Sequence, residues 1–426
     1  MATYESYKDS GVKWLGQIPS HWDTGKMREF FSERKQLSQD GSEMLLSVSE
    51  YSGITPSTND AGENVSRSAS LVGYMKCKAS DLIINIMLAW KRGLGISEYD
   101  GIVSPAYCVF GTHNINPRYA NYLLRTDLYT AEFKRNSTGI IESRLRMYPD
   151  DFKNIVCIKP PKDEQEAIVA YLDKVTGDID RAIEAQQKMI DALNERKQII
   201  ITRAVTRGLN PDAPLRDSCI DWLGQIPEHW EIVRTSFVYP KIGSGTTPSS
   251  SNEAYYSDNG ISWLQTGDLN DGILSGTSKC ISSKAMKEVK LRVYPKNSIV
   301  IAMYGATIGK TSIVDFDTTV NQACCVLPAN SKCDSGFALF YFQSTKNVLI
   351  QSANGGGQPN INQQLIRRHK MVLPPHDEQK EIVNYIKLKT IPLDKSIANC
   401  ERMISLLQER KHIIINEVVT GKKKVI

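Results

Sequence analysis

Hydrophobic residues recur at steps of three and four, or their sums, along two separate stretches of the chain. The positions in the first stretch are Ile168, Leu172, Val175, Ile179, Ile183, Ile190, Leu193 and Ile200, and those in the second are Ile382, Ile386, Leu393, Ile397, Ile404, Leu407 and Ile414. This spacing brings each set onto one face of a helix and is typical of a coiled-coil seam. The first helix is expected from about residue 163 to residue 206, ending near Gly208, a length of roughly 65 Å.

Both stretches begin after a Pro-Pro pair followed by an acidic residue. Asp163 is predicted to cap the first helix, with Glu166 completing a capping box, and Asp377 repeats the cap. Pro392 interrupts the second helix, so a kink or short break is expected there. Since each helix would otherwise leave an apolar stripe in water, the two are expected to pair with each other and act as a spacer. A plain dimerisation coiled coil that sets no spacing is the alternative.

The segments between these helices carry short runs of β-branched residues separated by turn residues. Residues 82–87 and 299–304 are predicted to be equivalent strands. Long polar loops at 244–252 and 354–364 are rich in Gly, Thr, Asn and Gln, which suit base recognition, although such residues also form ordinary solvated loops. Each segment is therefore predicted to be an α+β module with a sheet at its core.

The same motifs occur twice along the chain. Trp-Leu-Gly-Gln-Ile-Pro-x-His-Trp stands at 14–22 and again at 222–230, and Pro-Pro-x-Asp-Glu-Gln stands at 160–165 and again at 374–379. Two offsets that differ by only a few residues indicate a duplication. The predicted order is a module at 1–161, a helix at 162–208, a module at 209–375 and a helix at 376–426. The repeated tryptophans Trp14, Trp22, Trp222 and Trp230 are predicted to be packing anchors.

Composition and charge narrow the function only slightly. A net charge of +5 permits a polyanionic partner without requiring one. The nine cysteines include no CxxC pair and are predicted to be reduced and mostly buried, and the scattered histidines predict no metal site. With no signal peptide and no apolar run of ~18 residues, the protein is expected to be cytoplasmic, without membrane contact.

Two segments resemble catalytic motifs but lack an essential part. Residues 305–311 have one residue too few between their glycines for a phosphate-binding loop, and a β-like run follows in place of a helix. Matching Met87 to Met303 places residues 93–95 opposite residues 309–311, without lysine or threonine. Glu378-Gln379-Lys380 resembles the tail of a nuclease metal site, but helix capping explains it better. A nuclease or NTPase is therefore disfavoured, and no catalytic residue is predicted.

Over essentially its whole length the chain resembles the specificity subunit of type I restriction-modification systems. The resemblance rests on the two duplicated motifs, the Gly-Thr-Thr-Pro loop at 245–248, the segment 263–269 and the turn 304–309. It implies an α+β fold in which two target recognition domains are separated by two long antiparallel coiled-coil helices, with an internal pseudo-two-fold repeat. Each domain would read one half of a bipartite, asymmetric DNA sequence, and the helices would set the gap between the halves.

The resemblance also implies partners. These are double-stranded DNA, two copies of a modification methyltransferase subunit that carries S-adenosylmethionine and methylates adenine, and a restriction subunit that is a translocase using ATP and Mg²⁺. This chain itself is expected to be non-catalytic and to hold no cofactor. The alternative is a coiled-coil assembly scaffold that reads no DNA sequence.

Candidate DNA contacts follow from residue type and from the resemblance. In the first module they are Trp90, Lys91, Arg92, Ser104, Tyr107, Arg144 and Arg146, with Arg and Lys serving phosphate or guanine and Trp or Tyr stacking. In the second they are Thr246, Thr247, Thr266, Tyr304, Thr307, Lys310, Gln322, Gln358, Asn360 and Asn362. The first module has residues 47–54 where the second has the Gly-Thr-Thr-Pro loop, and it resembles the family's other module subtype, so contacts do not transfer simply between the two.

Overall fold

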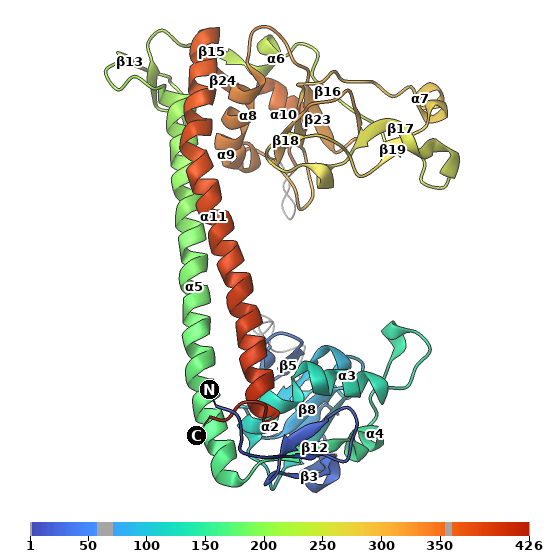
Figure 1. The fold of residues 1–426 in the computed structure, drawn as a ribbon. Helices are drawn as coiled ribbons and strands as arrows, with labels where there is room; N and C mark the ends of the chain where they lie inside the picture. Colours follow the sequence, from blue (N-terminus) through green and yellow to red (C-terminus); the bar gives the residue numbers. More distant parts are fainter. Residues whose placement is uncertain (1, 58–70, 354–359, 426) are drawn as a thin grey trace. The chain divides into compact units, whose positions relative to one another are not determined.

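The fold is taken from a computed structural model, which describes residues 2–57, 71–353 and 360–425 (Figure 1). The chain divides into two compact units. Unit 1 combines Met1–Gln187 with Glu401–Ile426, and unit 2 is Lys188–Cys400. Each unit therefore contains one module, the start of one long helix and the end of the other.

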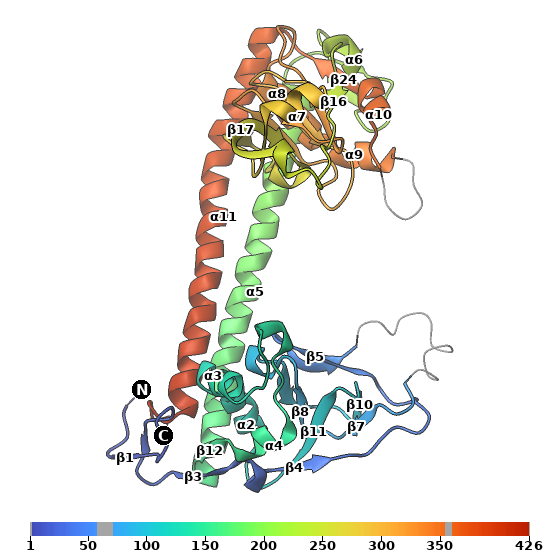
Figure 2. The same ribbon diagram turned by 90° about the vertical axis from the view of Figure 1, so that its right-hand side faces the viewer.

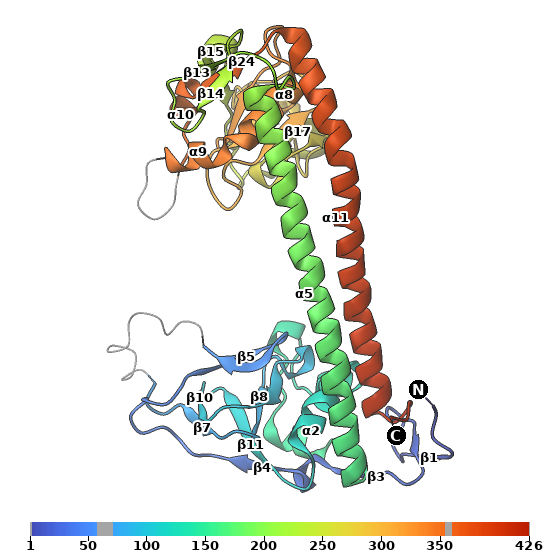
Figure 3. The same ribbon diagram turned by 90° about the vertical axis from the view of Figure 1, so that its left-hand side faces the viewer.

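The two long helices are α5, Lys162–Arg207, and α11, His376–Val419, which pair antiparallel (Figure 3). In unit 2 Lys197 Nζ lies 2.6 Å from an oxygen of Asp394, and in unit 1 Lys411 Nζ lies 2.6 Å from an oxygen of Asp180. The two ion pairs are equivalent in the internal repeat, because Lys411 corresponds to Lys197 and Asp394 to Asp180. Every residue of the predicted seam is buried or half-buried, which confirms that the helices pair with each other.

Two details of the predicted helices are wrong. α5 begins at Lys162, so Asp163 lies in its first turn and Pro161, whose carbonyl accepts from the Gln165 N–H, takes the cap position. Asp377 lies in the first turn of α11 in the same way. Their charges still favour the helix N-terminus. Of the kink or short break expected at Pro392, the break is absent: α11 continues through this residue, because tertiary packing of the seam outweighs one lost backbone hydrogen bond.

Unit 1 is built on a four-stranded sheet in the order β4-β11-β8-β9 (Figure 2). These strands are β4 (Phe31–Arg34), β11 (Tyr107–Thr112), β8 (Leu82–Asn85) and β9 (Leu94–Ile96), and all neighbours are antiparallel. Antiparallel pairs surround it: β1 (Tyr7–Asp9) with β2 (Gln17–Pro19), β3 (Asp23–Lys26) with β12 (Val156–Lys159), β5 (Leu46–Ser49) with β6 (Gly53–Pro56), and β7 (Met75–Cys77) with β10 (Gly101–Val103). The helices are α2 (Pro117–Leu124), α3 (Asp127–Arg135) and α4 (Pro149–Asn154), with the short η1 (Met27–Glu29), η4 (Ala89–Lys91) and η5 (Glu142–Arg144).

Unit 2 has a five-stranded sheet in the order β16-β23-β20-β21-β18. Its strands are β16 (Gly243–Ser244), β23 (Cys324–Leu327), β20 (Ile299–Ala302), β21 (Thr311–Val314) and β18 (Ile273–Leu274). A smaller sheet joins β19 (Cys280–Ile281), β17 (Tyr256–Leu264) and β22 (Thr319–Val320), and the pairs β13 (Leu215–Asp217) with β14 (Gln225–Pro227) and β15 (Glu231–Arg234) with β24 (Lys370–Leu373) complete the strands. The helices are α6 (Thr235–Val238), α7 (Ser283–Glu288), α8 (Ser335–Ser344), α9 (Lys346–Gln351) and α10 (Gln363–Arg368), with η6 (Glu253–Tyr255) and η7 (Thr266–Asp268).

Each module shares its hydrophobic core with the ends of the long helices. In unit 1 Ile168 and Leu172 of α5 and Val418 of α11 are buried in the same cluster as Phe110 of the sheet. In unit 2 Val205 and Ile382 are buried with Ile301. The coiled-coil seam thus continues directly into both module cores, which holds each module rigidly to the helix ends in its own unit.

A repeated set of polar contacts fastens each module to its helices. The indole N–H of Trp22 donates to Glu164 at 3.0 Å, and that of Trp230 donates to Glu378 at 3.1 Å. His21 and His229 contact the same two carboxylates. Trp22 and Trp230 are buried, while Trp14 packs on Tyr129 and Trp222 stacks on His369. The tryptophans are therefore packing residues, as predicted.

The glutamine of each Pro-Pro-x-Asp-Glu-Gln motif makes a second repeated contact. Gln165 donates to the Pro160 carbonyl at 2.8 Å and accepts from the backbone N–H of Asn116, the residue that caps α2. Gln379 donates to the Pro374 carbonyl at 2.8 Å and accepts from the N–H of Asp334, which caps α8. We call these contacts of Trp22, Glu164 and Gln165, and their counterparts Trp230, Glu378 and Gln379, the joint of each unit.

The cysteines lie mostly in the interior and form no disulfide bonds. All nine cysteines are unpaired; five are buried, three are half-buried and Cys219 is exposed. Within the described ranges, no group of three or more His, Cys, Asp and Glu residues is arranged to hold a metal ion. None of the helices described is long and apolar enough to cross a membrane.

Candidate nucleic-acid interface

Strand pairing gives the structural alignment of the two modules. β8 pairs with β9 and β11 just as β20 pairs with β21 and β23, with Leu82 opposite Ile96 and Phe110 in one sheet and Ile299 opposite Ile313 and Leu327 in the other. These pairs alone fit more than one alignment, but Leu82 and Ile84 are buried with the long helices just as Ile299 and Ile301 are, and this matches Met87 to Tyr304, one residue away from the predicted match to Met303. The sequence match was wrong because similar apolar runs align almost equally well at neighbouring positions, whereas the face of the sheet on which each residue is buried selects one.

The corrected register still excludes a phosphate-binding loop. Arg92 now corresponds to Gly309, and both have left-handed backbone, with φ of 63° and 75°. In this alignment Gly93 corresponds to Lys310, so the first module again lacks the lysine. The 305–310 turn joins antiparallel strands β20 and β21, with no helix whose N-terminus could hold a phosphate.

In unit 1 the candidate residues come together at one end of the sheet, where β8 finishes and β9 and β11 begin. We call this end edge 1. The η4 turn follows β8 there, and Tyr107 opens β11 opposite Asn85. The backbone N–H of Met147 donates to the Ile86 carbonyl at 2.8 Å and brings the loop 138–146 to the same end. Edge 1 therefore carries all seven predicted residues: Trp90, Lys91, Arg92, Ser104, Tyr107, Arg144 and Arg146.

The surroundings of Trp90 favour a supporting role over base stacking. Its indole N–H donates to the Met87 carbonyl at 3.1 Å. The ammonium groups of Lys91 and Lys134 lie 4.9 and 5.0 Å from the ring centroid. Two cation–π contacts on one half-buried ring hold positive charge at edge 1, where a DNA phosphate would meet it.

The other residues of edge 1 differ in how exposed their side chains are and in whether they already have hydrogen-bond partners. Arg92 pairs with Asp127 and donates to the Arg125 carbonyl at 3.1 Å. Tyr107 is half-buried, and burial raises its pKa, so the phenol is a hydrogen-bond donor at neutral pH. Arg144 is exposed, whereas the backbone of Arg146 bonds to that of Thr138 and closes the loop.

In unit 2 the corresponding end of the sheet, edge 2, lies where β16 and β20 finish and β23 begins. The Gly245 N–H donates to the Asn321 carbonyl at 3.2 Å, and the Asn321 N–H donates to the Leu264 carbonyl at 2.9 Å. Met303 bonds to both Ala323 and Ile361 through its backbone, each at 2.8 Å. These bonds gather Thr246, Thr247, Thr266, Tyr304, Gln322, Asn360 and Asn362, and the turn with Thr307 and Lys310 lies at the same end. Gln358 lies outside the described residues.

Several of these side chains already have partners. The Thr247 hydroxyl bonds to the Gln322 amide, which orients an exposed amide at edge 2. Asn362 accepts from the Leu365 N–H at 2.8 Å and caps α10, which argues against its reading a base. Asn360 is exposed and suited to adenine.

Gly245 shapes edge 2, and the candidate set missed it. A Cβ atom at this position would lie 1.5 Å from the Val320 carbonyl oxygen, so only glycine allows the Thr246–Thr247 segment to pass over the turn that carries Gln322. The signal was present in the Gly-Thr-Thr-Pro motif, but close approach between distant segments is visible only in the fold.

Two exposed apolar side chains near edge 1 were also missed. Tyr51, between β5 and β6, is 93% exposed, and Ile140, in the loop that ends at Arg146, is 101% exposed. Both occupy polar turns, where a single large side chain gives no periodic signal.

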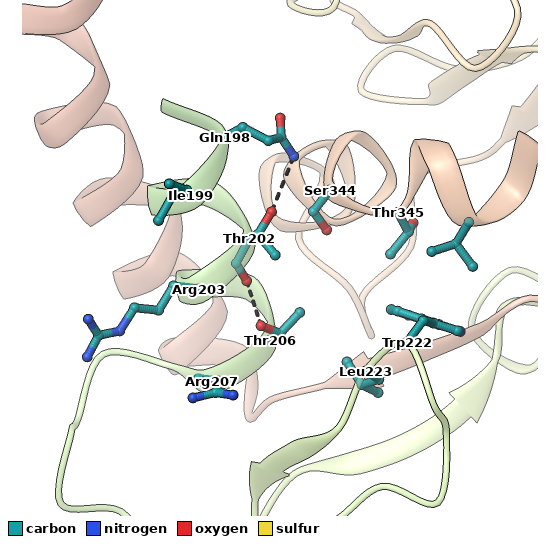
Figure 4. A pocket seen from close by; sticks show the side chains of 11 residues that line it. Gln198, Ile199, Thr202, Arg203, Thr206, Arg207, Trp222, Leu223, Ser344 and Thr345 are labelled. Carbon is teal, nitrogen blue, oxygen red and sulfur yellow. Dashed lines mark hydrogen bonds between the residues drawn. The ribbon is translucent and has the colours of Figure 1, made fainter. Parts of the chain in front are cut away.

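A cavity of about 700 Å³ in unit 2 lies apart from these residues (Figure 4). It is lined by the end of α5, by Trp222 and Leu223, and by the junction of α8 and α9. Thr206 donates to the Thr202 carbonyl and Gln198 to the Thr202 hydroxyl, and Arg203 points away from Trp222 in this view. None of the candidate DNA contacts lines it, so it is not part of edge 2.

Comparison with known proteins shows which family the chain resembles. Residues 227–397 match the type I restriction modification DNA specificity domain. Two proteins of Methanocaldococcus jannaschii, the provisionally named type I restriction enzyme MjaX specificity subunit and the MjaVIII specificity subunit, are each 23% identical; both alignments cover 98% of this chain, and 98% and 97% of the relatives. A chain solved in work on complex assembly and conformational transition of the type I R-M system has the same fold, with a TM-score of 0.68 at 15% identity over 94% of this chain and 98% of that one. Together with the duplicated joints, these matches show that the chain is similar along its whole length to the specificity subunits of type I restriction-modification systems and that residues 227–397 form the DNA specificity domain of that family.

Proposed function

We propose that this chain is the DNA-reading subunit of a type I restriction-modification complex and that it recognises a bipartite, asymmetric target. The module of residues 1–161 reads one half-site and the module of residues 209–375 reads the other. The observation that carries the proposal is that two nearly identical joints hold two chemically different edges. The candidates at edge 1 are mostly arginine, lysine and aromatic residues, whereas those at edge 2 are mostly threonine, glutamine and asparagine, with Lys310 as the one lysine among them.

The residue types at each edge suit DNA. Arg and Lys form bonds with phosphates and with guanine, while Gln and Asn pair with the N6 and N7 atoms of adenine. The antiparallel pairing of α5 and α11 supports a spacer role for the helices at 162–208 and 376–426, which would set the unspecified gap between half-sites.

The duplicated framework suits two copies of one partner. A pseudo-two-fold protein presents the same surface twice, and in this family the partner with two copies is the adenine methyltransferase that carries S-adenosylmethionine. A restriction subunit that uses ATP and Mg²⁺ completes the endonuclease. We assign no catalytic residue and no cofactor to this chain, and we place it with genomic DNA in the cytoplasm.

The test is to co-express the chain with the adenine methyltransferase encoded beside it and to map methylated adenines across the host genome. The expected result is one gapped bipartite motif, of which one half changes when residues 1–161 are exchanged for those of a relative. Methylation that needs no such chain would overturn the proposal. Methylation that needs the chain but ignores module exchange would favour an assembly scaffold instead.

A further inference from the structure

Arg125 forms an unusual set of hydrogen bonds beside edge 1. It follows α2 directly, and its Nη1 donates to the carbonyls of Arg92 at 3.0 Å and Leu94 at 2.5 Å. Its Nη2 donates to the carbonyls of Glu50 and Tyr51, each at 3.0 Å. One guanidinium thus joins the turn between β5 and β6 to the turn between β8 and β9.

The bonds of Arg125 are all to neutral groups. Among the ion pairs found in the described part of the chain, none includes Arg125. Burial, with a smaller contribution from the charge of Arg92, lowers its pKa to about 10, so the group is still a cation at neutral pH. Burying a cation without a carboxylate is costly, and bonds from a charged donor to four carbonyls offset that cost only while both turns keep their places.

The turn that Arg125 holds presents Tyr51 to solvent. The Ser49 hydroxyl accepts from the N–H groups of Tyr51 and Ser52 at 3.1 and 3.3 Å, which fixes the turn from its other side. The Tyr51 side chain is 93% exposed. A large aromatic ring on a turn held from both sides contributes little to folding, because its apolar area stays in water.

In the described part of the second module no arginine joins two turns in this way, although Gln343 donates to the Asp271 carbonyl of one distant segment at 2.6 Å. Thr126 and Thr345 both follow the first helix of a helix pair, which places Ser344 where unit 1 has Arg125. The Ser344 hydroxyl donates only within its own helix, to Tyr341. The two modules share their protein partner but read different half-sites. A feature found in one module alone therefore fits a role in reading that module's half-site better than a role in binding the shared partner.

We propose that Arg125 is a positioning residue of module 1 and that Tyr51, which it holds beside the turn of Trp90, Lys91 and Arg92, packs its ring against the DNA of that half-site. The inference rests on the proposed function and adds a residue and a mode of contact to it. The cations of the adjoining turn make DNA the favoured occupant, since Lys91 is exposed and its ammonium lies over the Trp90 ring of that turn. Aromatic contact would then complement phosphate contact from the adjoining turn.

The test uses the chain assembled with its adenine methyltransferase and duplexes carrying single base changes in either half-site. The variants are Arg125→Ala, Arg125→Lys, Tyr51→Ala and Tyr51→Phe. The control is Arg118→Ala, on the helix α2 that Arg125 follows, whose arginine forms an exposed pair with Asp173. Discrimination is the ratio of methylation rates on cognate and altered duplexes.

Arg125→Ala and Tyr51→Ala are expected to lower discrimination at the half-site of module 1 roughly tenfold and to leave the other half-site unchanged. Arg125→Lys should behave like Arg125→Ala, because one ammonium cannot reach both turns. Tyr51→Phe should retain most discrimination, since the ring is kept. Should Arg125→Ala fail to assemble, Tyr51→Ala carries the test alone, because an exposed side chain leaves the fold intact.

Other outcomes overturn the inference in distinct ways. Unchanged discrimination at the first half-site for Tyr51→Ala would remove Tyr51 from the interface. Equal loss at both half-sites would show a general defect, and weaker assembly with unchanged discrimination would show that Tyr51 contacts protein. A wild-type complex with no sequence preference would instead overturn the proposed function itself.

Discussion

Unit 1 and unit 2 share their joints almost atom for atom, but their edges are held by different means. Trp22 and Trp230 donate to equivalent glutamates, and Gln165 and Gln379 bond to equivalent prolines. At edge 1 an arginine ties two turns together, whereas at edge 2 a glycine lets two segments touch. Both units are built on the same pair of long helices, and the joints that attach the modules to these helices are alike. The edges differ, as expected if each edge reads a different half-site.

One position of the shared framework differs between the two units. The Met27 N–H donates to the Ile155 carbonyl in unit 1, and the Thr235 N–H donates to the His369 carbonyl at the equivalent place in unit 2. Ile155 is buried, while His369 lies against Trp222, Tyr341 and Phe342 with a buried Nε2 that has no hydrogen-bond partner. The comparison thus predicts that equivalent substitutions in the two joints lower stability equally, whereas acid lowers the stability of unit 2 more than that of unit 1.

The largest expected effect is loss of either buried tryptophan of the joints. Trp22→Ala and Trp230→Ala should each lower the free energy of unfolding by about 3–5 kcal/mol, because each leaves a cavity and removes one hydrogen bond from the glutamate of the joint. Denaturant unfolding, with hydrogen exchange to report each unit, measures this. The control is Trp222→Ala, whose indole is 37% exposed and should cost much less. A large cost in one unit only would contradict the equivalence of the joints.

Acid should destabilise unit 2 through His369. Burial lowers the pKa of His369 to about 4, below its ordinary value. The unfolded chain therefore binds the proton more readily, and stability present above about pH 6.5 is lost as the pH falls toward 4, by about 3 kcal/mol. His369→Ile, which copies unit 1, should remove this pH dependence in unfolding measurements between pH 7 and 4. An unchanged pH profile in that variant would rule out His369 as the cause.

Gly245→Ala should affect edge 2 alone. The added methyl group would collide with the Val320 carbonyl, displace Thr246 and Thr247, and reduce discrimination at the half-site of module 2 about 5- to 100-fold. Methylation of duplexes altered in either half-site measures this. Gly276→Ala, where a Cβ meets open space, is the control. An equal loss at the half-site of module 1 would show that the two edges are not independent.

The smallest expected effects come from the repeated ion pairs. Lys197→Ala and Lys411→Ala should each cost about 0.2–1 kcal/mol of unfolding free energy, since both pairs are largely exposed. High salt should reduce both costs alike. A loss above about 2 kcal/mol at either position would mean that the pair does more than an exposed ion pair can.

Much of the framework could be predicted because its signals are local or repeated. The seam residues from Ile168 to Ile200 follow a helical period, and the duplicated motifs mark equivalent positions without any structure. The finer errors were of one kind. The start of α5, the passage through Pro392 and the register of Met87 each depend on competition between local preference and packing, which local rules do not weigh.

The candidate site could be predicted only in part. Residue type selected Lys91, Gln322 and Asn360, which the fold brings to the two edges. It also selected Trp90 and Asn362, whose polar groups are used for internal bonds. Arg125 and Gly245 were missed because their roles lie in contacts with residues far away in the sequence.

By itself the sequence determined that this protein is a duplication with two α+β modules and two helices that carry matching apolar seams, because periodicity and repetition are properties of residue order. Only the tertiary structure decided that each unit joins the start of one long helix to the end of the other, and that Glu164 meets Trp22 while Arg125 meets Glu50 and Tyr51. Those contacts join distant segments, and their geometry depends on backbone hydrogen bonds and close packing that no local pattern encodes.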